Sequence, residues 1–165
     1  MKRRAEDFRR LMSELAADAA DLDALLSANE RAAARIAAGA GDDLDFGALG
    51  YTIHNLYGVI ENYCLRIAKF FENGLDPVSW HRDLLGRMAL DIPGVRPALL
   101  DREVLARLDE LRAFRHLFRH LYARPLDRAK VQLVQEQVAP ALAAFKVAHR
   151  NYLELLEAIA EELRD

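Results

Sequence analysis

One basic and aromatic stretch decides how the chain is organised: Leu111-Arg112-Ala113-Phe114-Arg115-His116-Leu117-Phe118-Arg119-His120-Leu121-Tyr122. On a helix of about 3.6 residues per turn, its apolar side chains gather on one side, namely Leu111, Phe114, Leu117, Phe118 and Leu121. The other side carries Arg112, Arg115, His116, Arg119 and Tyr122, with His120 at its edge. We therefore predict an amphipathic helix that is anchored in a core and presents cations and imidazoles.

Hydrophobic periodicity around this stretch predicts an all-α chain. Apolar residues recur three and four positions apart over about residues 3–38 and 46–72, and a shorter helix is expected over about residues 79–88. Glycines follow the first two helices and favour their ends. Asp45 is the expected N-cap of the second helix. Residues 91–99 contain Pro93, Gly94 and Pro97 and are predicted to form an irregular connection.

Aspartate and proline bound the last two helices. Asp101 is the expected N-cap of the helix that holds the opening stretch. That helix should stop near Arg124, because Pro125 disfavours helical geometry in the residue before it. Asp127 then starts the last helix, in which Pro140 should cause a kink or an interruption.

Composition indicates a cytoplasmic protein with one hydrophobic core. A chain of 165 residues fits a single domain, here an antiparallel up-and-down bundle of four long helices with one short helical insertion. The first residues lead into acidic ones rather than into the apolar stretch of a signal peptide, and no apolar run is long enough to span a membrane. Cys64 is the lone cysteine, so we expect no internal disulfide, a reducing compartment and a small core residue at this position.

The net charge of −3 argues against a protein coated in positive charge for duplex binding. Nucleic acid would have to meet a local patch, and residues 112–130 form one. Metal-free cleavage of RNA needs a group that takes the 2′-hydroxyl proton, a group that protonates the leaving oxygen, and cations near phosphorus. His120 and Arg115 are the residue types suited to these tasks, because imidazole transfers protons near neutral pH and guanidinium matches phosphate oxygens.

Spacing complicates this pair. Arg115 and His120 are separated by about 140° of helix turn, so the length of arginine or a second protomer has to bring them together. His116 and His120 are four residues apart and share a face, which is also half of a zinc site. We favour a site without metal, because acidic and cysteine ligands are missing nearby in the sequence and the arginines would repel a cation.

The opening stretch also resembles a known family. Arg115, four residues, His120, one residue and Tyr122 read R-x4-H-x-Y, which resembles the motif of HEPN-domain ribonucleases and specifically of HepT-like toxins. The doubled Arg-His pair is similar to one subgroup of these toxins. Further similarity lies in Asn55-Leu56-Tyr57 with Ile60-Glu61, and in Trp80-His81-Arg82-Asp83-Leu84-Leu85. The resemblance covers about residues 46–127.

The resemblance implies a HEPN-like bundle that cuts RNA, with tRNA or mRNA as substrate, and leaves a cyclic phosphate end. Arg115 and His120 would be catalytic, while Arg112, His116, Arg119 and Tyr122 would bind RNA. Family members usually place two motifs at a dimer cleft, which implies a homodimer. They form type VII toxin–antitoxin pairs with MntA-type nucleotidyltransferases, which can transfer AMP to the tyrosine of the motif, here Tyr122. No metal or cofactor is expected.

Two supporting residues and one rival function stay open. Glu61 either orients Arg115 or a neighbour, or faces water; His81 either points into the cleft or lies on the surface. The rival function is a HEPN bundle that no longer cuts RNA and serves as the docking partner of a nucleotidyltransferase. The intact Arg115-His120-Tyr122 set favours the enzyme, whereas His116 departs from the asparagine that many HepT proteins carry after the arginine.

Overall fold

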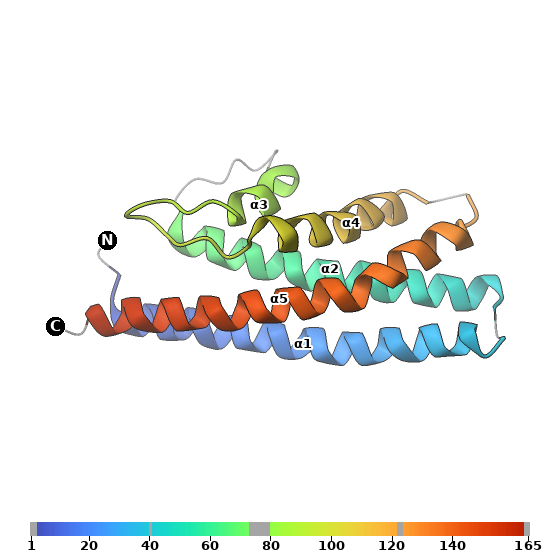
Figure 1. Cartoon of the computed structure of the whole chain (residues 1–165), viewed down its shortest axis with the longest axis horizontal. Coiled ribbons are helices and arrows are strands. Elements are labelled where there is room, and N and C mark those ends of the chain that lie inside the picture. The colour runs from blue at the N-terminus through green and yellow to red at the C-terminus, as the bar shows by residue number, and fades with distance from the viewer. Residues whose placement is uncertain (1–2, 40, 73–79, 122–123, 164–165) are drawn as a thin grey trace.

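Five helices form an all-α bundle in the computed structural model, which describes residues 3–39, 41–72, 80–121 and 124–163. The helices are α1 (Ala5–Ala37), α2 (Asp43–Phe71), α3 (Trp80–Met88), α4 (Arg102–Arg119) and α5 (Arg128–Glu162). Figure 1 shows four long helices roughly along one axis, the short α3 beside α4, and both termini at the same end. The predicted fold class is confirmed, and no strand is assigned within the described residues.

The core lies where α2 packs against α1, α4 and α5. It is built from the apolar faces of the helices, with Leu15, Ile53, Ile60 and Leu142 among its buried members. Cys64 belongs to this core as predicted, and its burial raises the pKa of the thiol to about 12. None of the described helices is long and apolar enough to cross a membrane.

The N-caps follow the sequence in two of three cases. Asp101 accepts the amide N–H of Val104 at 2.8 Å, and Asp127 accepts N–H groups at the start of α5, as predicted. The prediction for α2 was wrong, because Asp42 is the N-cap and accepts the N–H of Asp45 at 2.9 Å. Asp45 lies in the first turn, where its carboxylate accepts from Arg35 at 3.0 Å.

Helix α4 ends earlier than predicted, at Arg119 rather than near Arg124. Its C-cap is His120, whose ring Nδ1 donates to the carbonyl oxygen of His116 at 2.7 Å. That oxygen is the i−4 acceptor that a continuing helix would offer to the His120 amide. The amide instead donates to the carbonyl oxygen of Leu117 at 3.1 Å, which tightens the last turn. The helix therefore ends several residues before Pro125.

Helix α5 continues through Pro140. The prediction was a kink or an interruption. The interruption is absent from this described helix, and Figure 1 shows that the helix bends towards its N-terminal end. Bending without a break fits the loss of one N–H donor in a helix whose other side is held by the core.

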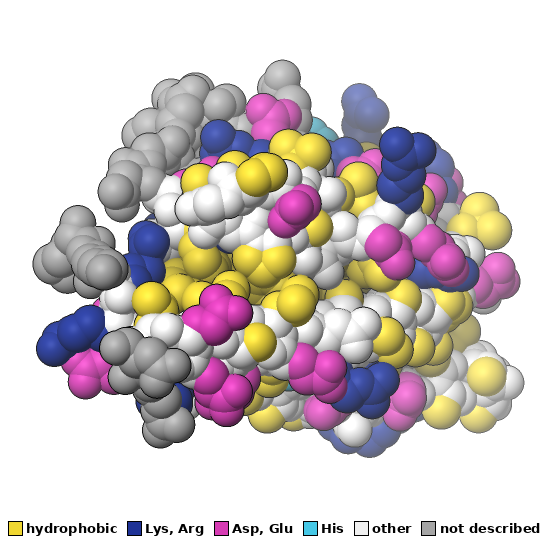
Figure 2. All heavy atoms as spheres, turned by 60° about the vertical axis from the view of Figure 1, so that its left-hand side comes forward, with side chains coloured by type: hydrophobic (Ala, Val, Ile, Leu, Met, Phe, Trp, Pro, Cys, Tyr) yellow, Lys and Arg dark blue, Asp and Glu magenta, His cyan; other side chains and the backbone are white. Residues whose placement is uncertain are grey.

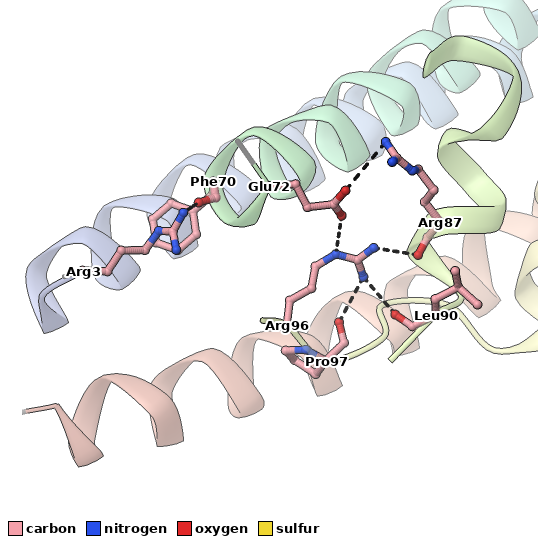
Figure 3. Close-up of polar contacts among 7 residues, drawn as sticks. All are labelled: Arg3, Phe70, Glu72, Arg87, Leu90, Arg96 and Pro97. Carbon is pink, nitrogen blue, oxygen red and sulfur yellow. Dashed lines mark hydrogen bonds and ion pairs between the residues drawn. The ribbon is translucent and has the colours of Figure 1, made fainter. Parts of the chain in front are cut away.

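A buried arginine fixes the irregular connection between α3 and α4. Arg96 is fully buried and donates to the carboxylate of Glu72 at 2.9 Å, to the carbonyl of Arg87 at 2.7 Å and to the carbonyl of Leu90 at 3.0 Å (Figure 3). A further bond joins it to the carbonyl of Pro97. One guanidinium thus satisfies two carbonyl groups of the connection and one at the end of α3.

The surface is not uniformly polar. Figure 2 shows hydrophobic side chains gathered in a band across the middle of one face, with charged side chains around it. Hydrophobic side chains also line a groove of about 280 Å³ between α5 and the start of α4. Val104, Val147 and Leu155 are among the residues that line it.

Candidate functional site

Arg115 lies on the side of α4 that faces α2. Its Nη1 donates to Oε2 of Glu61 at 3.1 Å, and its guanidinium lies 5.9 Å from the centre of the Tyr57 ring. The Arg115 and Glu61 side chains are only 19% and 8% exposed. The prediction that Arg115 lies on an open polar face was therefore wrong. Of the two alternatives left open for Glu61, the structure shows the one in which it pairs with Arg115.

Spacing along α2 explains why Glu61 is in reach. His54, Tyr57 and Glu61 are three and four residues apart, so they follow one another on the face of α2 that meets α4. The helices approach closely nearby, since a Cβ atom on Gly50 would lie 2.9 Å from the Phe118 ring. Glycine at this position lets α4 bring its basic end against α2.

Tyr57 is buried. Burial, and then the charge of Glu61, raise the pKa of its hydroxyl far above the usual range, so the group stays protonated. Its Oη and the Nε of Arg115 are buried and have no hydrogen-bond partner among the described residues. Unsatisfied buried polar atoms are uncommon in folded proteins. Two such atoms at the contact between α2 and α4 make this contact a candidate functional site.

His54 is a candidate site residue that the sequence motifs did not single out. Its ring is partly buried 5.5 Å from the Phe118 ring, and its Nδ1 is buried with no partner in the described part of the chain. Burial, followed by the charges of Arg115 and Arg119, lowers the pKa of this imidazole. The three-residue step from His54 to Tyr57 was the available signal, because it puts a histidine on the face that holds Glu61.

His116 and His120 share the exposed end of α4, as predicted, with ring centres 4.7 Å apart. Because Nδ1 of His120 faces a carbonyl oxygen at 2.7 Å, it must carry a proton. In the neutral ring the other nitrogen, Nε2, then holds a lone pair and can accept a proton. His120 thus has the tautomer needed for proton transfer at Nε2.

The other two arginines of the predicted site, Arg112 and Arg119, lie on α4 and are more open to solvent than the buried side of that helix. Arg112 pairs with Asp109 at 2.6 Å, and Arg119 is exposed. Leu117 is 43% exposed, so its predicted place in the core was wrong. Helix α4 packs against α2, α3 and α5, and Leu117 falls on the side that these contacts leave open.

Two predicted site residues fall outside the part of the chain that the structure describes. Tyr122 lies outside the described residues, and the side chain of His81 lies outside them as well, although its backbone belongs to α3. Among the described residues, no group of three or more His, Cys, Asp or Glu side chains is arranged to hold a metal ion, so His116 and His120 have no third ligand there.

Comparison with known proteins gives a family. The family model described as HepT-like protein matches residues 48–156, which include most of α2, all of α3 and α4, and most of α5. No curated protein and no solved structure matches the chain. The matched region covers more than half of the chain and contains Glu61, Arg115 and His120. The chain therefore belongs to the HepT-like protein family.

Proposed function

We propose that this protein is a metal-independent endoribonuclease and the toxin half of a type VII toxin–antitoxin pair, acting on tRNA or mRNA. The observation that carries the proposal is the ion pair between Arg115 and Glu61 within a chain of the HepT-like family. A carboxylate that fixes the arginine of the R-x4-H-x-Y motif prepares a phosphate-binding group, because the bond to Glu61 uses only one of the five N–H donors of the guanidinium.

The proposed reaction is attack by the 2′-oxygen of a ribose on the adjacent phosphorus. One group takes the 2′-hydroxyl proton, the new bond from the 2′-oxygen to phosphorus forms, and the bond to the 5′-oxygen breaks. The departing 5′-oxygen takes a proton, which leaves a cyclic phosphate and a 5′-hydroxyl. Nε2 of His120 performs a proton transfer, Arg115 stabilises the charge on phosphorus, and Arg112, His116, Arg119 and Tyr122 hold the strand.

The test is RNA cleavage by the purified protein in EDTA, on a panel that includes tRNA. Wild type should cut, His120→Ala and Arg115→Ala should be inactive, and Arg102→Ala, an exposed position at the other end of α4, should keep full activity. Equal activity of wild type and His120→Ala would overturn the proposal.

We also propose that the active form is a homodimer. One face of α2 supports this, because it carries no charge over five turns; its residues are Leu44, Ala48, Tyr51, Asn55, Gly58 and Asn62. Leu44 and Tyr51 on this face are 83% and 59% exposed. Pairing of two such faces would bury them and bring two copies of the motif to one cleft. Light scattering should give a dimer for wild type and a monomer for Tyr51→Glu.

The proposed partner is a nucleotidyltransferase antitoxin that adds AMP to Tyr122. The added charge and bulk would block the site beside His120. Incubation with the cognate transferase and ATP should increase the mass of wild type by AMP and abolish RNA cleavage, while Tyr122→Phe should stay unmodified. No mass increase on wild type would count against this partner.

The docking module stays as the second candidate. The low exposure of Arg115 favours it, because an ion pair of Arg115 with Glu61 that water hardly reaches could serve the fold alone. A folded, unmodified protein that binds the transferase and cuts no RNA in the panel would select this alternative.

A further inference from the structure

We propose that His54 is a neutral hydrogen-bond donor to the RNA phosphate, a third group of the site beside Arg115 and Arg119. This inference rests on the proposed function, and it concerns a residue outside the R-x4-H-x-Y motif. It assigns to His54 the binding of a phosphate oxygen and not the transfer of a proton.

The position of His54 supports this role. The ring lies 5.5 Å from the ring of Phe118, and the charges of Arg115 and Arg119 on α4 act on it. It is partly exposed, so a ligand can reach it, yet it lies one turn before Tyr57 on the face of α2 that meets α4. A phosphate that binds Arg115 or Arg119 would therefore come close to this imidazole.

Burial of one ring nitrogen decides which nitrogen holds the proton. Nδ1 of His54 is buried and has no partner among the described residues. A buried N–H without an acceptor is the rarer and costlier arrangement, so the neutral ring should carry its proton on Nε2. The Nε2–H group is then a donor, and the ring presents no lone pair to a substrate hydroxyl at that nitrogen.

Burial and the surrounding charges favour the neutral form of this donor. The groups that act on His54 are Arg115 and Arg119 from α4 and Glu61 from α2. Burial and the two arginines disfavour the imidazolium more than Glu61 favours it, which lowers the pKa of His54. A neutral donor can bind phosphate beside two cations without adding a third charge to a crowded site.

His120 shows the opposite arrangement. Its Nδ1 donates to a backbone carbonyl, so its Nε2 accepts a proton. The two histidines thus divide the work, with His120 transferring a proton and His54 binding the phosphate. Glutamine carries an N–H donor close to the position of Nε2 and has no titratable group, so it can replace a donor but not a proton acceptor.

The experiment compares His54→Gln, His54→Leu and wild type, with Lys69→Leu as a control at an exposed position on α2. We expect kcat/KM for RNA cleavage to fall about 100-fold in His54→Leu and to stay within about tenfold of wild type in His54→Gln. The pH profile of His54→Gln should keep both limbs of wild type. Thermal unfolding of each variant shows whether the fold is retained.

Two outcomes would overturn the inference. Full activity in His54→Leu would mean that His54 takes no part in the site. Equal loss in folded His54→Gln and His54→Leu, with one limb of the pH profile missing in His54→Gln, would make His54 a proton-transfer group instead.

A binding assay separates this inference from the proposed function. If wild type cuts no RNA, the ribonuclease proposal fails, and the variants are then compared for binding of a 2′-O-methyl oligonucleotide by fluorescence anisotropy. Weaker binding by His54→Leu than by His54→Gln would support the donor role without cleavage. Equal binding by both variants, or no binding by wild type, would overturn it.

Discussion

At the scale of single residues, the ion pair of Arg115 with Glu61 is the contact that organises the candidate site. The pair is largely buried and joins α2 to α4, and the Tyr57 ring lies beside the guanidinium. Removing one partner of a buried pair leaves the other charge without compensation. The conformation of Arg115 is therefore set by a residue 54 positions earlier in the chain.

Two substitutions of Glu61 test this dependence. Glu61→Gln keeps an acceptor for Arg115 but removes the charge, and we expect RNA cleavage to fall about tenfold. Glu61→Ala should lower cleavage about 100-fold, because a displaced catalytic group costs about that factor. It should also lower the free energy of unfolding by about 1–3 kcal/mol. Steady-state kinetics and urea denaturation measure both effects, with Lys69→Ala, at an exposed position on the same helix, as the control. Unchanged kinetics in Glu61→Ala would separate Glu61 from the site.

At the scale of helices, the approach of α2 to α4 positions the basic end of α4. Gly50 is buried at this contact, and the Phe118 ring packs beside both His54 and Phe114. Phe118 is two residues before His120. Its packing against α2 therefore fixes where the end of α4, which carries the exposed histidines, lies along the bundle.

Gly50→Ala should disturb this contact. The added Cβ would lie 2.9 Å from Phe118 and 3.3 Å from Leu126, so we expect a loss of about 1–3 kcal/mol in the free energy of unfolding and lower RNA cleavage. Gly47→Ala is the matched control in the same helix, because a Cβ there meets nothing within 4 Å. That control should be neutral or more stable by up to about 1 kcal/mol. Equal unfolding midpoints for the two variants would show that α2 and α4 can separate without cost.

At the scale of the whole molecule, Arg96 holds together the end of the bundle that is opposite the motif. It joins the end of α2 to α3 and to the connection before α4 (Figure 3). Near this network, Arg3 donates to the carbonyl of Phe70 and lies over its ring. The buried Arg96 and the partly buried Arg3 thus stabilise one end of the bundle, while the candidate site occupies the other.

Arg96→Met should destabilise the fold by about 3–5 kcal/mol, because Glu72 and several carbonyl groups lose their donor inside the protein. Arg102→Met, at an exposed position, should change the free energy of unfolding by less than about 0.5 kcal/mol. Urea denaturation followed by circular dichroism measures both. A loss below about 1 kcal/mol for Arg96→Met would mean that water replaces these bonds readily.

Stability should fall in mild acid. The pKa values of His54 and His149 are lowered below the usual 6.5, mainly by burial, so the unfolded chain binds more protons than the folded chain below that pH. The stability that these groups contribute is present above pH 6.5 and is lost as the pH falls through their folded pKa values. His149→Gln should therefore show a smaller loss between about pH 7.5 and 5.5 than wild type. Arg150→Gln, the exposed neighbour, should keep the wild-type slope; equal slopes in all three proteins would contradict the argument.

The sequence by itself determined the helices and the family motif. Apolar spacing places the helical segments, and Asp101 and Asp127 cap two of them, because periodicity and capping act within a few residues. The motif of Arg115, His120 and Tyr122 is likewise a local pattern, and it pointed to the family that the comparison shows. Glu61 was a candidate partner for Arg115, but spacing within one helix does not fix a contact with another.

Only the tertiary structure decided which side chains meet. It turned Arg115 towards Glu61, buried Tyr57, left Leu117 exposed and brought His54 beside Phe118. These outcomes depend on how much of each helix its neighbours cover, and periodicity along one helix carries no information about that coverage. The early end of α4 could not be predicted from the sequence either. It depends on a hydrogen bond from the His120 ring to the carbonyl oxygen that the next turn of helix would need as an acceptor.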